Sequence, residues 1–307
     1  MSDTFVIREF NGDDSRLEIS DYGAQVLSWA PVGQPSVIWR PSALVLEAGV
    51  PIRGGVPVVT PWFGAGYASG HALGLSPKHG SARLSFWHCE DPSDSSDGRV
   101  RYRLDLPADA ADPSGQPLRA VYEVGAGGSL RMTLTVANVG EASASVEMAL
   151  HTYLRVGDVR RTRVRGLSGV GYWDAAAGGV DRVQQEEDIA FAGEVDRVYG
   201  VARPLEVHDP VLNRVIHVRS DGAEQTVVWN PGERIGDAIT DMAPGEWSSF
   251  VCVEAALCRG HAVELAPGES CTLGQTLSLC DCAWPGPTKL LVRARRSPLN
   301  DACVIYV

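Results

Sequence analysis

Short stretches in which apolar and polar residues alternate recur along most of this chain. The alternation is strict over residues 100–106 and 130–136, and a period of two is typical of a strand with one buried face. Similar runs lie at residues 214–219, 225–229, 249–255 and 271–279, and turn-forming clusters such as residues 125–128 lie between such runs. Helical spacing is rare, and a single short helix is expected over residues 184–190. The pattern predicts an all-β sandwich.

No fixed-period repeat and no shift in composition divides these strands into groups. With 307 residues, of which 44% are hydrophobic, the chain is long enough to bury one large core. We therefore expect residues 1–285 to form a single β-sandwich domain. Residues 286–307 are expected to be a C-terminal extension that is loosely attached to this domain.

The charge balance argues against two broad classes of partner. The chain has 38 acidic and 27 basic residues, and a formal net charge of −11 repels nucleic acids and anionic membranes. The N-terminus lacks the basic and apolar segments of an export signal, and no apolar run of about 18 residues occurs anywhere. The seven cysteines show no repeated framework. We expect a cytoplasmic monomer with mostly free thiols.

Basic residues nevertheless gather within residues 53–83. Arg53, Lys78, His79 and Arg83 lie there among glycines, prolines and aromatic residues, which is an unusual composition for a core strand or helix. Any anion that this acidic protein binds is expected to meet this local basic cluster. The alternative is structural, because glycine and proline also mark a long connection between strands.

Two later stretches put a polar residue on the face of a strand that points away from its aliphatic side. Over residues 145–156, alternation assigns the aliphatic residues to one face and His151 to the other. Over residues 250–255, Val251 and Val253 share one face, so Glu254 lies on the opposite one. Alone, either polar residue is more often hydrogen-bonded or solvated than functional. A cleft on a sheet face would bring both together.

Eight short motifs follow one another along the chain. They are RGGVP (53–57), PWFG (61–64), HGSAR (79–83), LHTY (150–153), GEVDRVY (193–199), VWNP (228–231), TDM (240–242) and VCVEA (251–255). The motifs occur in the order seen in hexose-6-phosphate mutarotases, which the chain resembles from about residue 20 to 280. These enzymes are the glucose-6-phosphate 1-epimerase branch of the aldose 1-epimerase, or galactose mutarotase-like, superfamily. The resemblance implies a large twisted antiparallel sandwich with few short helices and a sugar-binding cleft on one concave face.

The resemblance also implies roles for individual residues. By matched motif, Glu254 would be the general base and His151 the general acid, with His79 a second polar residue near the sugar ring oxygen. Arg53 and Arg83 would hold a phosphate, because a guanidinium presents a planar fork that matches two phosphate oxygens.

Other residues near these motifs are assigned less specific roles. Lys78 would add a point charge near the phosphate, and Asp241 would either bond a sugar hydroxyl or stabilise a turn. Asp196 and Arg197 are interpreted as an ion pair that braces the cleft wall. The aromatic residues Trp62, Phe63 and Trp229 are interpreted as core residues, one of which could stack on the sugar.

The implied reaction explains why an acid and a base are needed together. Interconverting the α and β anomers of a hexose 6-phosphate requires taking a proton from the C1 hydroxyl while giving one to the ring oxygen, and a carboxylate with an imidazolium meets that need. No metal, nucleotide or redox cofactor enters this chemistry. Two other functions stay open, namely a mutarotase for unphosphorylated aldoses and a non-catalytic carbohydrate-binding sandwich.

Overall fold

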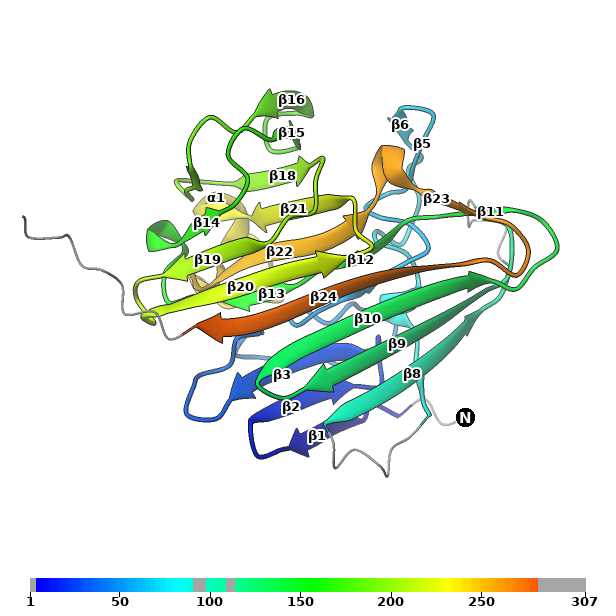
Figure 1. The fold of residues 1–307 in the computed structure, drawn as a ribbon, viewed down its shortest axis with the longest axis horizontal. Coiled ribbons are helices and arrows are strands. Elements are labelled where there is room, and N and C mark those ends of the chain that lie inside the picture. The colour runs from blue at the N-terminus through cyan, green and yellow to red at the C-terminus, as the bar shows by residue number, and fades with distance from the viewer. Residues whose placement is uncertain (1–3, 91–97, 109–113, 281–307) are drawn as a thin grey trace, which may run out of the picture.

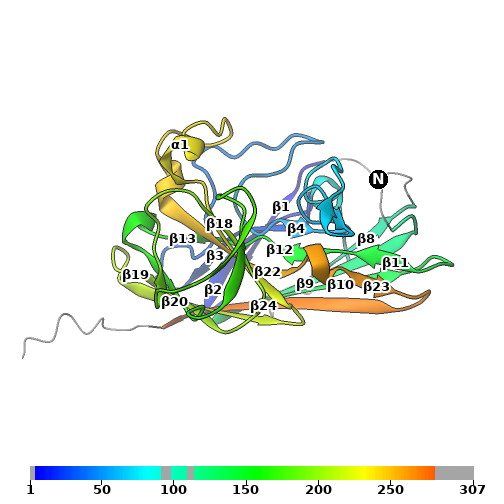
Figure 2. The same ribbon diagram turned by 90° about the horizontal axis from the view of Figure 1, so that it is seen from above.

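A computed structural model describes residues 4–90, 98–108 and 114–280, and its body is a sandwich of two large antiparallel sheets (Figure 1). One sheet has nine strands, in the spatial order β17 (Asp188–Ile189), β14 (Arg163–Arg165), β19 (Leu205–Asp209), β20 (Arg214–Asp221), β24 (Ser270–Cys280), β10 (Ser129–Asn138), β9 (Leu118–Ala126), β8 (Arg99–Leu106) and β7 (His88–Cys89). Figure 2 shows the long strands β9, β10 and β24 of this sheet in one layer. The all-β sandwich predicted from the alternation is confirmed.

The second sheet has eight strands and faces the first across the core. Its spatial order is β16 (Val180–Val183), β15 (Gly171–Asp174), β18 (Val195–Tyr199), β21 (Gln225–Asn230), β22 (Phe250–Leu257), β12 (Met148–Leu150) and β4 (Val58–Val59), with β13 (Tyr153–Arg155) also paired to β22. Figure 2 shows β12 and β22 in the layer next to β24. The site described below lies on the face of this sheet that points away from the core.

Smaller elements complete the part of the chain that the structure describes. They are a three-stranded sheet of β1 (Ile7–Asn11), β2 (Ser15–Ser20) and β3 (Gln25–Pro31), the pairs β11 (Ala144–Val146) with β23 (Val263–Leu265) and β5 (Tyr67–Ala68) with β6 (His71–Ala72), the helix α1 (Gly232–Gly236), and 3-10 turns at Ala82–Leu84, Val159–Arg161, Glu246–Ser249 and Arg259–His261. Few short helices were expected, and this is what the described residues contain. None of their helices is long and apolar enough to span a membrane.

The core lies between the inward faces of the two large sheets. Leu273 and Leu277 of β24 belong to the same buried cluster as Leu150, Val251 and Val253 of the second sheet. Burying such aliphatic side chains contributes roughly 1.5–3 kcal/mol each, so this cluster dominates the stability of the sandwich. The period-two assignment of these faces is therefore correct for both stretches that carry the polar residues of interest.

The helix expected over residues 184–190 is wrong. Ile189 belongs to β17, where it pairs with Val164, and its side chain is buried in the main core. Gln184 is also buried, and its Oε1 accepts hydrogen bonds from Tyr199 and Arg197. Local helical preference is weak, and these tertiary contacts override it.

The assignment of residues 1–285 to one domain stays a prediction. The proposed extension at residues 286–307 lies outside the described residues.

Candidate active site

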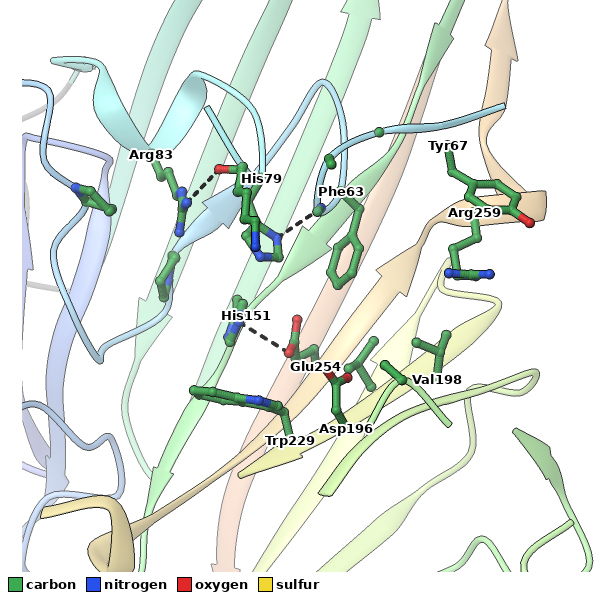
Figure 3. Close-up of a pocket in the computed structure, with 18 of the residues that line it drawn as sticks. Phe63, Tyr67, His79, Arg83, His151, Asp196, Val198, Trp229, Glu254 and Arg259 are labelled. Carbon is green, nitrogen blue, oxygen red and sulfur yellow. Dashed lines mark hydrogen bonds and ion pairs between the residues drawn. The ribbon is translucent and has the colours of Figure 1, made fainter. Parts of the chain in front are cut away.

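A cavity of about 570 Å³ lies on the outer face of the eight-stranded sheet, against strands β13, β15, β18, β21 and β22. Its floor includes the apolar side chains of Val198 and Val227. Its roof is built from residues 51–83, among them Phe63, His79 and Arg83 (Figure 3). Six of the seven residues predicted as site residues line this single cavity, namely Arg53, Lys78, His79, Arg83, His151 and Glu254. Asp241 is not among the lining residues.

Strand register brings the base candidate into the cavity. In the antiparallel pairing, Glu254 of β22 lies opposite Val227 of β21, and Val227 lies opposite Val198 of β18. Paired residues point to the same face of a sheet, so Glu254 shares the cavity face with these two apolar side chains. Only 1% of Glu254 is exposed, which places its carboxyl group in a largely desolvated setting.

His151 reaches the cavity from the neighbouring strand segment. It lies between β12 and β13, and its backbone N–H donates to Pro57 O at 3.1 Å. Its ring stacks on Tyr153, with centroids 5.0 Å apart, and its Nε2 lies 3.5 Å from Oε1 of Glu254. The two residues, which alternation assigned to the non-aliphatic faces of two different strands, therefore meet as a close pair, as Figure 3 shows.

Burial controls the protonation of this pair. Burial raises the pKa of Glu254 well above its ordinary value, and the negative charge of Asp196 raises it further. Burial also lowers the pKa of His151, as do the nearby His79, Arg83 and Arg53. The raised pKa of Glu254 favours a protonated carboxyl group, and the lowered pKa of His151 favours a neutral imidazole. The imidazolium inferred from the sequence is thus not the state that this environment favours on its own.

Two arginines and a lysine form the cationic end of the cavity. Arg53 donates through Nε to both carboxylate oxygens of Asp241 at 3.1 Å and through Nη1 to the Tyr153 hydroxyl at 3.2 Å. Arg83 donates through Nη2 to Lys78 O at 2.6 Å, and no carboxylate of the described residues forms an ion pair with it. Burial lowers the pKa of Arg83 to about 10, which still leaves it charged at neutral pH. An anion is the natural partner for such a group.

Asp241 holds Arg53 in place and lies behind it, outside the cavity. Both side chains are about one quarter exposed, and the Nε–H of Arg53 is shared between the two carboxylate oxygens of Asp241, which holds the guanidinium beside it. This arrangement differs from both interpretations made from the sequence, a bond to a sugar hydroxyl and the stabilisation of a turn.

His79 stands beside His151 with a defined tautomer. The backbone N–H of Gly64 donates to His79 Nδ1 at 3.3 Å, so the neutral ring carries its proton on Nε2. Burial, followed by the charges of Arg83 and Lys78, lowers the pKa of His79 to about 3. The two histidine rings lie 5.5 Å apart. His79 is therefore arranged as a neutral hydrogen-bond donor.

The roof depends on glycines that approach other backbone segments closely. A Cβ on Gly55 would lie 2.4 Å from Val26 O, and one on Gly80 would lie 2.2 Å from Thr60 O. Both residues also have positive φ, a region that side chains disfavour. Glu147 fixes the roof from below, because its carboxylate accepts from the backbone N–H of Phe63 at 3.0 Å and from that of Arg259.

Asp196 lies at the cleft wall, as expected from the sequence, but without the ion pair to Arg197. It lies on β18 two positions from Val198 and points into the cavity beside Glu254 (Figure 3). Burial raises its pKa to about 6, with further contributions from Glu194 and Asp174. The expected ion pair with Arg197 is not formed, because neighbouring residues of a strand point to opposite faces. That alternation was the signal that could have identified Asp196.

The end of the cavity away from Arg83 is closed by a stacked arginine. The Arg259 guanidinium lies 3.6 Å from the ring centroid of Trp173 and 4.4 Å from that of Tyr67, which belongs to the β5–β6 hairpin. Such cation–π contacts hold the planar group in a fixed orientation. No local sequence pattern links these three residues, which lie far apart in the chain.

Two of the three aromatic residues considered from the sequence also line the cavity. Phe63 and Trp229 do so, whereas Trp62 is buried and donates through Nε1 to Pro77 O at 2.9 Å. Phe63 and Trp229 therefore remain available for stacking on a sugar ring.

Comparisons with known proteins agree with this geometry. A family model described as "Aldose 1-epimerase" matches residues 7–278, a range that includes every cavity-lining residue. A protein of Salmonella typhimurium named "Putative glucose-6-phosphate 1-epimerase" is 32% identical over 262 residues, which are 83% of this chain and 84% of that protein. A protein of the same name from Cenchrus ciliaris is 29% identical over 264 residues, 82% of this chain and 78% of that protein. The crystal structure of "a putative mutarotase (YeaD) from Salmonella typhimurium" has a TM-score of 0.78 and 26% identity, and the match covers 91% of this chain and 92% of that one.

Proposed function

The chain belongs to the aldose 1-epimerase family, whose members are isomerases, and on that premise we propose that it interconverts the anomers of an aldohexose 6-phosphate. Glucose 6-phosphate is the first substrate to test, because the relatives named above carry it in their names. Mutarotation itself follows from the family. The phosphate and the roles of single residues are our proposal.

In the proposed mechanism, Glu254 and His151 act on the two oxygens bonded to C1. Glu254 takes the proton of the C1 hydroxyl as His151 Nε2 gives a proton to the ring oxygen, and the bond between C1 and the ring oxygen breaks to give the open-chain aldehyde. Rotation about the C1–C2 bond then presents the other face of the aldehyde. Reclosure returns both protons and gives the other anomer. The 3.5 Å separation of the two groups supports their acting on one centre.

We expect a phosphate bound at the arginines to change the protonation of His151 and Glu254. The charges of Arg83 and Arg53 lower the pKa of His151. In Figure 3, His151 lies on the side of Glu254 that is nearer to Arg83. A phosphate dianion beside those arginines favours a positive imidazolium near it and a carboxylate farther away. Substrate binding therefore favours transfer of the carboxyl proton of Glu254 to His151, which prepares the base and the acid together.

The other polar groups orient the sugar. Arg83, Arg53 and Lys78 hold the phosphate, and His79 donates its Nε2 proton to a sugar oxygen beside His151. Asp196 accepts from a ring hydroxyl on the side of Glu254, where its carboxylate faces the same cavity. Holding both ends of the substrate places C1 at the acid–base pair, and positioning of this kind lowers the activation barrier by several kcal/mol.

One observation carries this proposal, namely that a close His–Glu pair and a half-buried arginine without a carboxylate partner among the described residues share one cavity. The test is anomer exchange of glucose 6-phosphate followed by NMR. We expect the wild-type protein to accelerate the exchange over buffer, and Glu254→Gln to lower kcat by about 10²- to 10⁴-fold. Wild-type protein that gives no acceleration would refute the substrate assignment.

The phosphate contact has a separate test in the same assay. Arg83→Ala removes charge-assisted hydrogen bonds, so it should raise KM for glucose 6-phosphate by about 10-fold or more. The KM for free glucose should change little, since glucose has no phosphate. An equal change for both sugars would show that Arg83 has a structural role.

A specific observation keeps the mutarotase for unphosphorylated aldoses as the second candidate. Asp241 already neutralises much of the charge of Arg53, so the phosphate depends mainly on Arg83 and on the exposed Lys78. If kcat/KM for free glucose equals or exceeds that for glucose 6-phosphate, this second candidate replaces the first.

We also propose that the protein acts as a monomer in the cytoplasm. A doubly charged phosphate does not cross a bilayer unaided, so such a substrate is met inside the cell. Light scattering of the purified protein tests the oligomeric state, and a dimer would contradict the proposed monomer.

A further inference from the structure

A glutamine lies in the middle of the sandwich core, behind the acid–base pair. Gln275 of β24 is 1% exposed, and it occupies the inward face between Leu273 and Leu277, which are both fully buried. The period-two pattern calls for an aliphatic residue at this position. A buried amide costs free energy unless its polar atoms are bonded, so its contacts indicate what it does.

The side chain of Gln275 joins the backbone segments that carry the two groups of the pair. Its Oε1 accepts a hydrogen bond from the hydroxyl of Thr152, and its Nε2 donates to Val253 O at 3.1 Å. Thr152 directly follows His151, and Val253 directly precedes Glu254. The backbone N–H of Val253 also donates to Thr152 O at 3.0 Å, which closes a ring of three hydrogen bonds.

This ring lies where the regular strand pairing is interrupted. Leu150 is the last residue of β12 and pairs with Ala255, and the next pair along β22 is Tyr153 with Cys252. Between these pairs, the N–H of Thr152 donates to Leu150 O instead of to β22. The His151 segment thus has less backbone support from β22 than the residues on either side of it.

Because side chains alternate along a strand, this contact on the core side also affects the side chains that face the cavity. Thr152 and Val253 point into the core, so the adjoining His151 and Glu254 point into the cavity. Fixing the distance between the two inward residues fixes the separation of Nε2 and Oε1 on the other face. A displacement of about 1 Å at a reacting group can cost on the order of 10²-fold in rate.

We propose that Gln275, together with Thr152, is a positioning residue that sets the spacing of His151 and Glu254 from the core side of the sheet. This inference rests on the acid and base roles proposed above. Gln275 does not touch the substrate, because it lies on the far side of the sheet from the cavity. Its effect therefore falls on the chemical step and leaves substrate binding intact.

The test compares variants that keep volume and remove polarity. Gln275→Met and Thr152→Val should each lower kcat for anomer exchange by about 10-fold or more while KM changes less than about 3-fold. Thr152→Ser keeps the hydroxyl and should stay within about twofold of wild type. The double variant Gln275→Met with Thr152→Val should be no slower than the slower single variant, because both substitutions break the same ring of hydrogen bonds. The pH limbs of kcat should move in the slow variants, since the spacing of the pair sets its proton affinity.

Leu277→Met is the matched control, as a buried substitution on the same strand and the same face. Leu277→Met should leave kcat unchanged. Urea unfolding shows whether its loss of stability is comparable to that of Gln275→Met. If Gln275→Met does not fold, Thr152→Val combined with Gln275→Leu removes both side-chain partners and answers the same question. A kcat within twofold of wild type for Gln275→Met and Thr152→Val overturns the proposal. An equal loss of kcat in Leu277→Met also overturns it.

His151→Asn and Glu254→Gln in the same assay separate two kinds of failure. Full activity in both would refute the proposed acid and base, and with them this inference. Loss of activity in both, together with an unchanged Gln275→Met, would refute the positioning role alone.

Discussion

Replacing Asp196 by asparagine should make the folded protein more stable at neutral pH, although the residue lies in the cavity. Burial is the main cause that raises the pKa of Asp196 from 3.8 to about 6, and the charges of Glu194 and Asp174 add to it. The folded state thus resists ionising this carboxyl group, whereas the unfolded chain does not. Asparagine keeps the shape of the protonated acid and never ionises.

The sign and size of the effect follow from proton linkage. Below pH 3.8 Asp196 is protonated in both states, so the substitution should change little there. Between pH 3.8 and about 6 the unfolded chain ionises this carboxyl group while the folded state keeps it protonated, so the advantage of asparagine grows over this window and levels off above it. A separation of about two pKa units corresponds to at most about 3 kcal/mol. Because the side chain is only partly buried and water screens its charge, we expect a gain of about 1–2 kcal/mol at pH 8.

The assay is urea unfolding followed by tryptophan fluorescence at several pH values from 4.5 to 8. The advantage of Asp196→Asn should grow by about 1 kcal/mol across this range. Asp181→Asn is the control, because Asp181 is exposed on β16 and should change stability by less than about 0.5 kcal/mol at any pH. A gain of the same size at every pH, or a less stable variant at pH 8, would refute the reasoning.

The same variant should shift the pH dependence of catalysis. The charge of Asp196 helps to raise the pKa of Glu254, so its removal should lower that pKa. The acidic limb of the kcat/KM profile should then move to lower pH, because the base ionises earlier. A limb that stays in place would show that the carboxyl groups do not interact in the working enzyme.

Two further substitutions test the roof and the cationic end. Gly80→Ala should lower the free energy of unfolding by about 2–4 kcal/mol, because the new Cβ would meet Thr60 O at 2.2 Å with φ at +73°. Gly74→Ala has nearly the same φ but open space, so it should cost only about 1–2 kcal/mol; equal losses in urea unfolding would exclude the clash. Asp241→Asn should lower kcat/KM for glucose 6-phosphate by about 5-fold through a looser Arg53 and leave free glucose unaffected. A rise in kcat/KM for glucose 6-phosphate would show that the Asp241 carboxylate competes with the phosphate for Arg53.

Local pattern was enough to predict the strands and the faces on which His151 and Glu254 lie. Side chains alternate along any strand whatever it packs against, so aliphatic runs such as Val251 and Val253 reveal which side is the core. The same rule would have separated Asp196 from Arg197, which instead bonds Gln184 through Nη1 at 3.0 Å. That error came from treating neighbours in sequence as partners.

The remaining features depend on residues that are distant in sequence. Arg53 meets Asp241 across 188 positions, and Thr152 meets Gln275 across 123. No periodicity within one segment specifies the register between two segments, so only the packed sandwich decides these contacts. The protonation of the pair is decided in the same way, because burial and nearby charges exist only in the folded state. The sequence by itself determined which groups the cavity would offer, and the tertiary structure determined their spacing, their charge and the residues that hold them.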